Sequence, residues 1–306
     1  MIDNMVKTAV IQAAPILFNR EATIEKACRL IREAGESGCQ LILLPEAFVP
    51  AYPRGFSFGM VVGSRKPEGR LLWQRYWENG VDIPSSATEA LGAAAREANA
   101  IVSIGVIERD GGTLYCTQLY FDAQGNIMGK HRKLKPTGAE RLVWGEGQVP
   151  PPVFKTELGN IGGLTCWENY MPLARLSLYQ QGVELYLAPT ADSRDTWQAT
   201  MRHIACEGRC FVLGCNQFVT KAMYPADLPC YEELADLPAV MSRGGSVIVS
   251  PLGNVVAGPL WDEEGMITAV LDLNDIPRSK LDFDAVGHYA RPDIFQLQMG
   301  ANEHSI

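Results

Sequence analysis

The stretch GGLTCWENYMPLAR, residues 162–175, places a cysteine at a corner of the chain. A glycine pair and a short apolar approach lead to Cys166, and a helix pattern that begins with Pro172 follows. A cysteine that only fills a core does not need such a setting, whereas one that must meet a small molecule does. Since the thiolate is the reactive form of a thiol, a reactive Cys166 would need a base and a cation from elsewhere in the chain.

Length and charge exclude several classes of protein. The chain has 306 residues, 47% of them hydrophobic, which is enough for a large core. No linker or break in composition divides the first 280 residues, so we expect a single domain over 1–306. The formal net charge of −8, without a basic block, argues against binding to nucleic acid or an anionic membrane. No apolar run is long enough for a membrane span, and no export signal is evident, so we expect a cytoplasmic protein.

The eight cysteines do not suggest a disulfide framework. The chain is long, and its cysteines are scattered inside helix and strand patterns, which favours reduced thiols. Most of them are expected to fill the core as small hydrophobic side chains. They lie at positions 28, 39, 116, 166, 206, 210, 215 and 230.

Helix and strand patterns alternate along the chain, which indicates α/β layers with helices outside the sheets. The capping-box pair Ser86 and Glu89 is expected to begin the second helix. Two segments, 54–80 with many glycines and 221–243 with several prolines, are interpreted as surface insertions. Apolar periodicity predicts helices at 20–38, 86–99, 172–181 and 195–208. Strands are predicted at 6–14, 41–45, 101–108, 113–122, 127–134, 161–166, 183–189, 210–218, 246–259 (with a hairpin turn at 251–253) and 266–273.

Three chemically active residues follow predicted buried strands. Glu46 follows LILLP, Lys133 lies near the end of IMGKHRKL, and Cys166 ends the strand IGGLTC. Ligands of α/β folds gather at the carboxyl ends of the strands, so these side chains are expected to meet there. A thiolate can attack as a nucleophile, a carboxylate can take its proton and activate water, and an ammonium can stabilise developing negative charge.

Each of these residues also has a simpler interpretation. Buried thiols usually only fill space, and Glu46 after a proline could cap a turn. Lys133 stands in a basic run, which is typical of a solvated face. Lys135 would share a face with Lys133 on a continuing strand, so spacing does not separate the two lysines.

A metal site is the main alternative that spacing raises. His203, Cys206, Cys210 and Cys215 form the pattern H-x2-C-x3-C-x4-C. An apolar stripe that includes Trp197 runs along the same predicted helix, and none of the short-loop zinc spacings is matched. The pattern therefore favours a helix that packs on the core, and we expect no metal.

Several motifs together resemble the nitrilase superfamily, and within it the true nitrilase branch. The resemblance covers residues from about 6 to about 295 and is strongest to plant-type nitrilases and their bacterial relatives. Three motifs carry most of it: LPEAFVPAYPRGFSFG (44–59), GKHRKLKPTGAERLVWGEG (129–147) and GGLTCWENYMPLAR. It continues through ELYLAPTADS (184–193), EGRCFVLGCNQF (207–218), GGSVIVSPLG (244–253) and VGHYARPD (286–293).

The resemblance implies a four-layer αββα sandwich with a Glu–Lys–Cys catalytic set. Glu46 matches the general base, Lys133 the catalytic lysine and Cys166 the nucleophile. Glu140 matches a second glutamate that positions the lysine and the substrate. The match also selects Lys133 over Lys135, which residue spacing did not.

The resemblance also suggests pocket residues. They are Tyr52, Trp167, Thr190 and Ala191, with core packing as the alternative for Trp167. One departure from the family pattern is Ala51, where glycine is usual before Tyr-Pro. The added methyl group could shift Tyr52, which bears on substrate preference rather than on catalysis.

The activity that the resemblance implies is hydrolysis of a small nitrile to a carboxylic acid and ammonia, without a cofactor or metal. The substrate would be aliphatic or arylaliphatic. A cyanide dihydratase and an aliphatic amidase of the same superfamily are the alternatives, although CWEN after the cysteine favours nitrilases over amidases. A non-catalytic scaffold is disfavoured because all three catalytic positions are filled. The family forms homo-oligomers, so a dimer or a larger, spiral assembly is expected.

Overall fold

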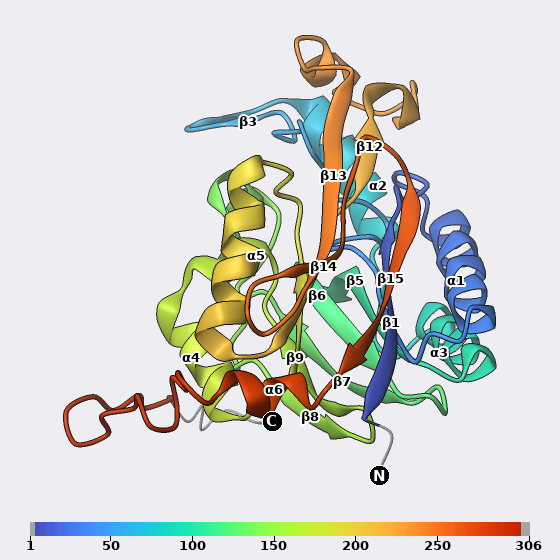
Figure 1. The fold of residues 1–306 in the computed structure, drawn as a ribbon. Coiled ribbons are helices and arrows are strands. Elements are labelled where there is room, and N and C mark those ends of the chain that lie inside the picture. Colours follow the sequence, from blue (N-terminus) through green and yellow to red (C-terminus); the bar gives the residue numbers. More distant parts are fainter. Residues whose placement is uncertain (1–3, 301–306) are drawn as a thin grey trace.

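Four layers, α–β–β–α, make up the computed structural model, which describes residues 4–300 (Figure 1). The first sheet has the order β15-β1-β2-β5-β6-β7. Its strands are β1 Met5–Gln12, β2 Leu41–Leu43, β5 Ile101–Asp110, β6 Thr113–Phe121, β7 Ile127–Arg132 and β15 Gly265–Asp272. The second sheet has the order β12-β13-β11-β10-β9-β8, with β14 beside β13. Its strands are β8 Val153–Thr156, β9 Gly159–Gly163, β10 Leu185–Pro189, β11 Phe211–Cys215, β12 Phe218–Thr220, β13 Val240–Val249 and β14 Val255–Trp261.

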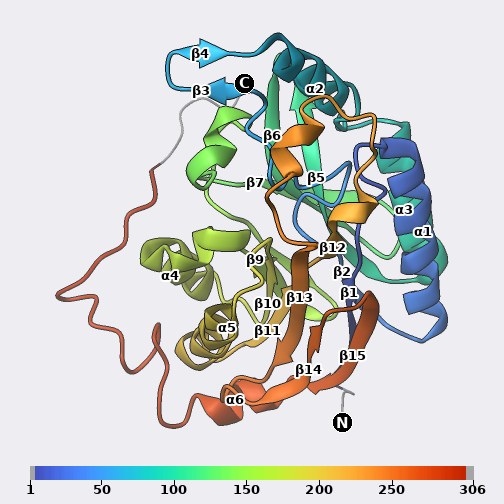
Figure 2. The ribbon, with the colours of Figure 1, turned by 90° about the horizontal axis from the view of Figure 1, so that it is seen from above.

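Helices cover the outer faces of both sheets. On the first sheet lie α1 Arg20–Glu36 and α3 Ser86–Ala98, and on the second lie α4 Pro172–Gln180 and α5 Asp195–Gly208. Seen from above, the two helix pairs stand on opposite sides of the paired sheets (Figure 2). The αββα prediction is therefore confirmed. The remaining elements are the hairpin β3 Met60–Val61 and β4 Ser64–Arg65, the helices α2 Pro67–Glu78 and α6 Asp275–Ser279, and the 3-10 turns η1 Gly138–Leu142, η2 Cys166–Tyr170, η3 Lys221–Met223 and η4 Tyr231–Leu234.

An apolar layer between the sheets holds the sandwich together. Leu41 and Leu43 of β2 belong to the same buried cluster as Leu187 of β10 and Leu213 of β11. Each such side chain contributes about 2 kcal/mol by its removal from water. Strands such as β2 are continuous runs of hydrophobic residues because one face of the strand packs on the other sheet and the opposite face packs on helices.

Strand directions bring the site segments to one edge. In the first sheet, β1, β2 and β5 are parallel, and β7 returns to the same direction through the antiparallel β6. In the second sheet, β9, β10 and β11 are parallel. The segments that leave β2, β7 and β9 carry the three residues expected to react.

Four local expectations were wrong. The second helix is capped one residue earlier, by Ser85, whose N–H donates to Thr88 Oγ1 at 2.9 Å. The strand expected over 210–218 is two strands, β11 and β12. The strand β9 ends at Gly163, before the cysteine, and β7 is a half-exposed edge strand rather than a buried one.

The two segments interpreted as insertions contain ordered structure. Residues 54–80 hold the β3–β4 hairpin and α2, whose Leu72 and Tyr76 are fully buried. Residues 221–243 include the buried Leu234 and the start of β13. Their status as insertions stays a prediction. Among residues 4–300, none of the helices is both long and apolar enough to cross a bilayer.

Candidate active site

Glu46 lies in a loop that closely approaches strand β5. Gly105 N–H of β5 donates to Pro45 carbonyl at 3.0 Å. A side chain at Gly105 would place its Cβ 2.4 Å from Ala47 N, so only glycine allows the loop this close. On its other side the loop is held by Gln217, whose amide donates to the Glu46 carbonyl at 2.8 Å. The Glu46 side chain is thus fixed where it is fully buried.

Lys133 follows β7 directly and extends its pairing with β6, because Lys133 N–H donates to Cys116 carbonyl at 2.8 Å. Its side chain is fully buried and bridges two carboxylates. Lys133 Nζ donates to Glu46 Oε1 at 2.8 Å and to Glu140 Oε2 at 2.7 Å. Lys135, by contrast, has a half-exposed side chain that pairs with Glu146. Burial therefore separates the two lysines that spacing left equivalent.

Cys166 begins the 3-10 turn η2 after β9 and has a φ of 54°, in the left-handed region. A non-glycine residue is costly there and persists only where its surroundings hold it. Gly163 permits the close approach of β9 to β10, since a Cβ on it would lie 1.9 Å from Leu187 O. The helix expected from Pro172 is α4, a separate element, so Cys166 does not stand at its start.

Three hydrogen-bond donors hold the carboxylate of Glu140 in place. It lies on η1, and its Oε1 accepts the Tyr52 hydroxyl at 2.7 Å. Its Oε2 accepts Thr137 N–H at 2.7 Å as well as the Lys133 ammonium. The Tyr52 ring packs edge-on against Trp144, with centroids 5.6 Å apart. This arrangement fixes the carboxylate that in turn holds the lysine.

The electrostatics favour a protonated thiol and a charged lysine at rest. Burial, followed by the nearby charge of Glu46, raises the pKa of Cys166 to about 12. Burial disfavours the Lys133 ammonium, but Glu46 and its other acidic neighbours raise the pKa of Lys133 well above its usual value. Burial also raises the pKa of Glu46, against the opposing effect of Lys133. A base must therefore take the thiol proton. Glu46 Oε2 is available for this role, because it has no hydrogen-bond partner among the described residues.

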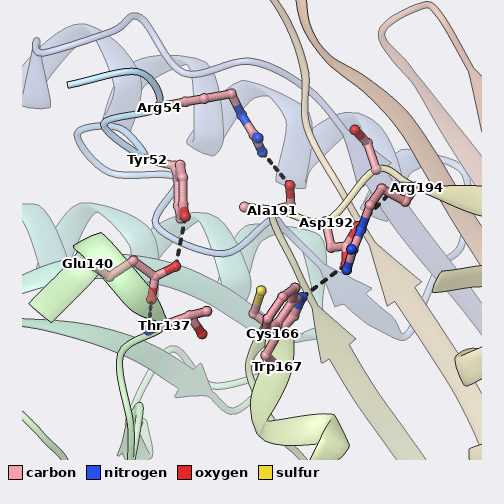
Figure 3. A pocket seen from close by; sticks show the side chains of 10 residues that line it. Tyr52, Arg54, Thr137, Glu140, Cys166, Trp167, Ala191, Asp192 and Arg194 are labelled. Carbon is pink, nitrogen blue, oxygen red and sulfur yellow. Dashed lines mark hydrogen bonds and ion pairs between the residues drawn. The ribbon is translucent and has the colours of Figure 1, made fainter. Parts of the chain in front are cut away.

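A cavity of about 230 Å³ opens beside Cys166 (Figure 3). In this view Tyr52 and Glu140 lie on one side of the cavity, and Asp192 and Arg194 lie on the other. Glu46 and Lys133 are not part of its wall, so a molecule in the cavity would meet the cysteine first. The lining residues are Tyr52, Arg54, Thr137, Glu140, Cys166, Trp167, Ala191, Asp192, Ser193 and Arg194.

Three of the four predicted pocket residues line this cavity: Tyr52, Trp167 and Ala191. Trp167 is partly exposed and donates through Nε1 to Asp192 Oδ2 at 2.9 Å, so it is not a core side chain. Thr190 is buried behind the wall, with its Oγ1 3.3 Å from Cys166 Sγ.

Ala51, the departure from the family pattern, is fully buried. Its carbonyl accepts the Tyr76 hydroxyl at 3.0 Å, and Trp144 Nε1 in turn donates to that hydroxyl at 3.2 Å. The Tyr76 side chain of α2 therefore fixes the segment in which Ala51 directly precedes Tyr52.

Sequence reasoning missed Glu168, which connects the cysteine turn to the lysine segment. Its fully buried carboxylate accepts Thr165 N–H at 2.8 Å and Leu134 N–H at 2.6 Å, and it lies 3.1 Å from His131 Nε2. Burial works against its charge, but His131 and the two N–H groups keep the pKa of Glu168 below its usual value. A signal was present, because Thr165 and Glu168 form the spacing of a capping box.

Cys116 was also missed as a neighbour of the site. Its Sγ lies 3.7 Å from Glu46 Oε1. The contact joins strand β6 to the loop after β2, and no pattern in the sequence of either segment indicates it.

The alternative metal set does not form a site. Cys215 is buried in β11, and Cys210 follows the end of α5, whereas the His203 side chain on α5 is exposed. Within residues 4–300, no three His, Cys, Asp or Glu side chains are grouped so that they could hold a metal ion.

The chain is similar to known proteins over nearly its whole length. The sequence model of the carbon-nitrogen hydrolase family matches residues 7–280. An aliphatic nitrilase of Sinorhizobium fredii (strain HH103) is 53% identical, over 95% of this chain and 94% of that protein. The bifunctional nitrilase/nitrile hydratase NIT4B of Nicotiana tabacum is 49% identical, over 95% of this chain and 85% of that protein.

Solved structures agree on the fold. A carbon-nitrogen hydrolase from Helicobacter pylori G27 has a TM-score of 0.71 at 20% identity and covers 91% of this chain and 92% of its own. An amidase from a Nesterenkonia species has a TM-score of 0.66 at 20% identity, covering 88% of this chain and 92% of its own. The four-layer fold, the family match over residues 7–280 and the relatives at about half identity lead to one assignment: the chain belongs to the carbon-nitrogen hydrolase family.

Proposed function

We propose that the protein is a nitrilase, which hydrolyses an organic nitrile to the carboxylic acid and ammonia with Cys166 as the nucleophile. The observation that carries this proposal is the ion-paired cluster of Glu46, Lys133 and Glu140 beside a cavity whose wall includes Cys166. The relatives named as nitrilases, at about half identity over almost the whole chain, support the same reaction.

The first half of the reaction forms a covalent bond to sulfur. Glu46 takes the Cys166 proton as the thiolate attacks the nitrile carbon, and the proton passes to the nitrile nitrogen. The product is a thioimidate. Because burial and the charge of Glu46 raise the pKa of Cys166 to about 12, this proton transfer has to accompany the attack rather than precede it. The Lys133 ammonium supplies a fixed positive charge for the negative charge that develops.

The second half consumes two water molecules. Glu46 activates the first, which adds to the thioimidate carbon, and the resulting tetrahedral centre expels ammonia to leave a thioester. The second water cleaves the thioester, releasing the carboxylic acid and restoring the thiol. If the tetrahedral centre expels the thiolate instead of ammonia, the product is the amide. We propose that ammonia leaves and that the acid is the main product. Glu140 accepts a second hydrogen bond from the Lys133 ammonium and is proposed to position it in both halves.

The cavity supports small substrates. Its volume of about 230 Å³ suits an aliphatic or arylaliphatic nitrile held between Tyr52 and Trp167. Cyanide and aliphatic amides are the alternative substrates, and a substrate panel separates them from nitriles.

Ammonia release from a nitrile panel tests the proposal, combined with mass spectrometry of the protein during turnover. The wild-type protein should release ammonia and carry a substrate adduct on the peptide that contains Cys166. Cys166→Ala should lose both signals while keeping its fold, and Cys206→Ala, on a half-exposed thiol outside the site, should keep both. Near wild-type turnover by Cys166→Ala, or amide as the dominant product, would contradict the mechanism.

We further propose a homo-oligomer of two or more chains, in the cytoplasm. Large apolar side chains are exposed along the last described segment, which runs away from the sandwich (Figure 1). They include Leu281, Tyr289, Ile294 and Phe295. A second copy of the chain would cover them. Light scattering at micromolar concentration should show no dominant monomer, and a stable, active monomer would refute this part.

A further inference from the structure

Arg54 is a cation in the cavity wall without a carboxylate partner. Its guanidinium donates to the Ala191 carbonyl, and within residues 4–300 it forms no ion pair (Figure 3). Arg194, the other arginine of the wall, is neutralised by Asp192, which it contacts through Nε at 2.9 Å and through a second nitrogen. Of the two guanidinium groups that line the cavity, only that of Arg54 carries an uncompensated charge.

The opposite charge predominates at the reactive end. Near Cys166, Glu46 and Glu140 share the single ammonium of Lys133. The cavity is therefore polarised, with excess negative charge near the thiol and excess positive charge at Arg54. A molecule with an anionic group at one end and a nitrile at the other would be oriented by this field with the nitrile toward Cys166.

We propose that Arg54 binds a carboxylate of the substrate, so that the preferred substrates are short nitriles with a carboxylate at the end distant from the nitrile. This inference rests on the proposed nitrilase function. A guanidinium has several coplanar N–H donors that match the two oxygens of a carboxylate. Arg54 also lies beside the Tyr52 ring, with its Cζ 5.3 Å from the ring centroid, which limits the positions its side chain adopts.

The size of the cavity limits the length of such a molecule. A water molecule occupies about 30 Å³ of liquid, so about 230 Å³ corresponds to roughly eight such volumes, which is the size of a short molecule. A nitrile of the size of 3-cyanopropanoate fits this volume and has two polar ends, one for Cys166 and one for Arg54. A carboxylate turned toward Cys166 would instead face Glu46 and Glu140, and like charges would exclude that orientation.

The competing role for Arg54 is structural, because its bond to the Ala191 carbonyl also ties the segment after β10 to the segment after β2. The two roles differ in what they predict. A tether affects charged and neutral substrates alike, whereas a carboxylate site affects only the charged substrate.

The experiment compares 3-cyanopropanoate with its neutral isostere 3-cyanopropanamide. Chromatography follows the product of nitrile hydrolysis, which is succinate from the first compound and 4-amino-4-oxobutanoate from the second. The wild-type kcat/KM should favour the anion by about tenfold or more, as expected for hydrogen bonds to a charged group. Arg54→Gln should remove this preference, mainly through a higher KM for the anion. Arg54→Lys should restore part of it, and Arg96→Gln, at an exposed arginine of α3 outside the cavity, should retain it.

A measurement on the wild-type protein alone guards against an unstable variant. Butanoate should compete with 3-cyanopropanamide, whereas butanamide should compete more weakly. The inference is overturned if the wild type does not prefer the anion, or if Arg54→Gln slows both substrates equally. Formation of 4-amino-4-oxobutanoate from 3-cyanopropanamide in those cases would leave the nitrilase function standing. Failure to hydrolyse the nitrile group of either compound, or of any other nitrile in the panel, would overturn both.

Discussion

The thiol of Cys116 lies 3.7 Å from Glu46 Oε1, the same oxygen that accepts the Lys133 ammonium at 2.8 Å. A thiol is a weak hydrogen-bond donor, so this contact favours the ionised form of the carboxyl slightly. Removing the donor by Cys116→Ala should raise the pKa of Glu46 and move the acidic limb of the kcat/KM profile to higher pH. Cys116→Ser, with a stronger donor, should move it to lower pH. Shifts in the same direction for both variants would show that the contact only fills space.

The wild-type pH profile itself should reflect the buried carboxyl. Burial raises the pKa of Glu46, and the reaction needs its ionised form, so activity should fall on acidification at a pH above the usual range of a carboxyl group. The pKa of Lys133 is raised well above its usual value, so loss of its charge should not limit activity in mildly alkaline solution. Rate measurements on a neutral nitrile give both limbs. An acidic limb at or below the pKa of an exposed glutamate would argue against Glu46 as the base.

The two lysines of HRKLK should behave very differently when replaced. Lys133→Ala removes the buried ammonium shared by Glu46 and Glu140, and kcat should fall by about a hundredfold or more, as for loss of a preorganised charge. Lys135→Ala removes only a surface ion pair with Glu146, which is worth at most about 1 kcal/mol. Steady-state kinetics on both variants provides the comparison, and the reverse ranking would assign the catalytic role to Lys135.

Glu168 should matter for stability as well as for activity. Glu168→Gln places an amide where the carboxylate accepts the N–H groups of Thr165 and Leu134, and should lower the free energy of unfolding by about 3 kcal/mol. The exposed Glu36→Gln should change it by less than about 0.5 kcal/mol. Denaturant titrations measure both.

The difference in unfolding free energy between wild type and Glu168→Gln should depend on pH in a defined direction. Because folding lowers the pKa of Glu168, its contribution to stability is present above the pKa of the unfolded carboxyl. This contribution is lost as the pH falls through the lower, folded pKa. The difference between wild type and Glu168→Gln should therefore shrink in acid, and a difference that grows in acid would contradict the assignment.

The sequence predicts most of the fold because its elements carry strong local signals. Helices such as α1 show apolar residues at helical spacing, and the buried β2 is wholly apolar. The arrangement of these elements into two facing sheets came from the family resemblance rather than from periodicity. Cap positions were less certain, since Ser85 and Ser86 are both suitable residues and only the backbone distinguishes them.

The candidate site could be predicted only in part. Residue type and spacing suggested Glu46, Lys133 and Cys166 but did not separate Lys133 from Lys135, because burial depends on the packing of distant segments. The contact between Cys116 and Glu46 could not be predicted for the same reason, because it too depends on how distant segments pack. Arg54 and Arg194 show the limit most clearly. Arg194 forms an ion pair with Asp192, whereas Arg54 forms none with the residues that the structure describes, and the sequence contains no sign of that difference.

The proposed nucleophile and its base belong to different sheets, with Cys166 after β9 and Glu46 after β2. The apolar layer of leucines between the sheets therefore sets their separation. Neither half of the chain can assemble the site by itself, because residues 1–150 contain Glu46, Lys133 and Glu140 but lack Cys166. During refolding, catalytic activity should consequently return only when the two sheets dock, after the helices and strands of each have formed. Recovery of enzyme activity can thus serve as a kinetic probe of sheet docking, a step that far-UV circular dichroism does not isolate.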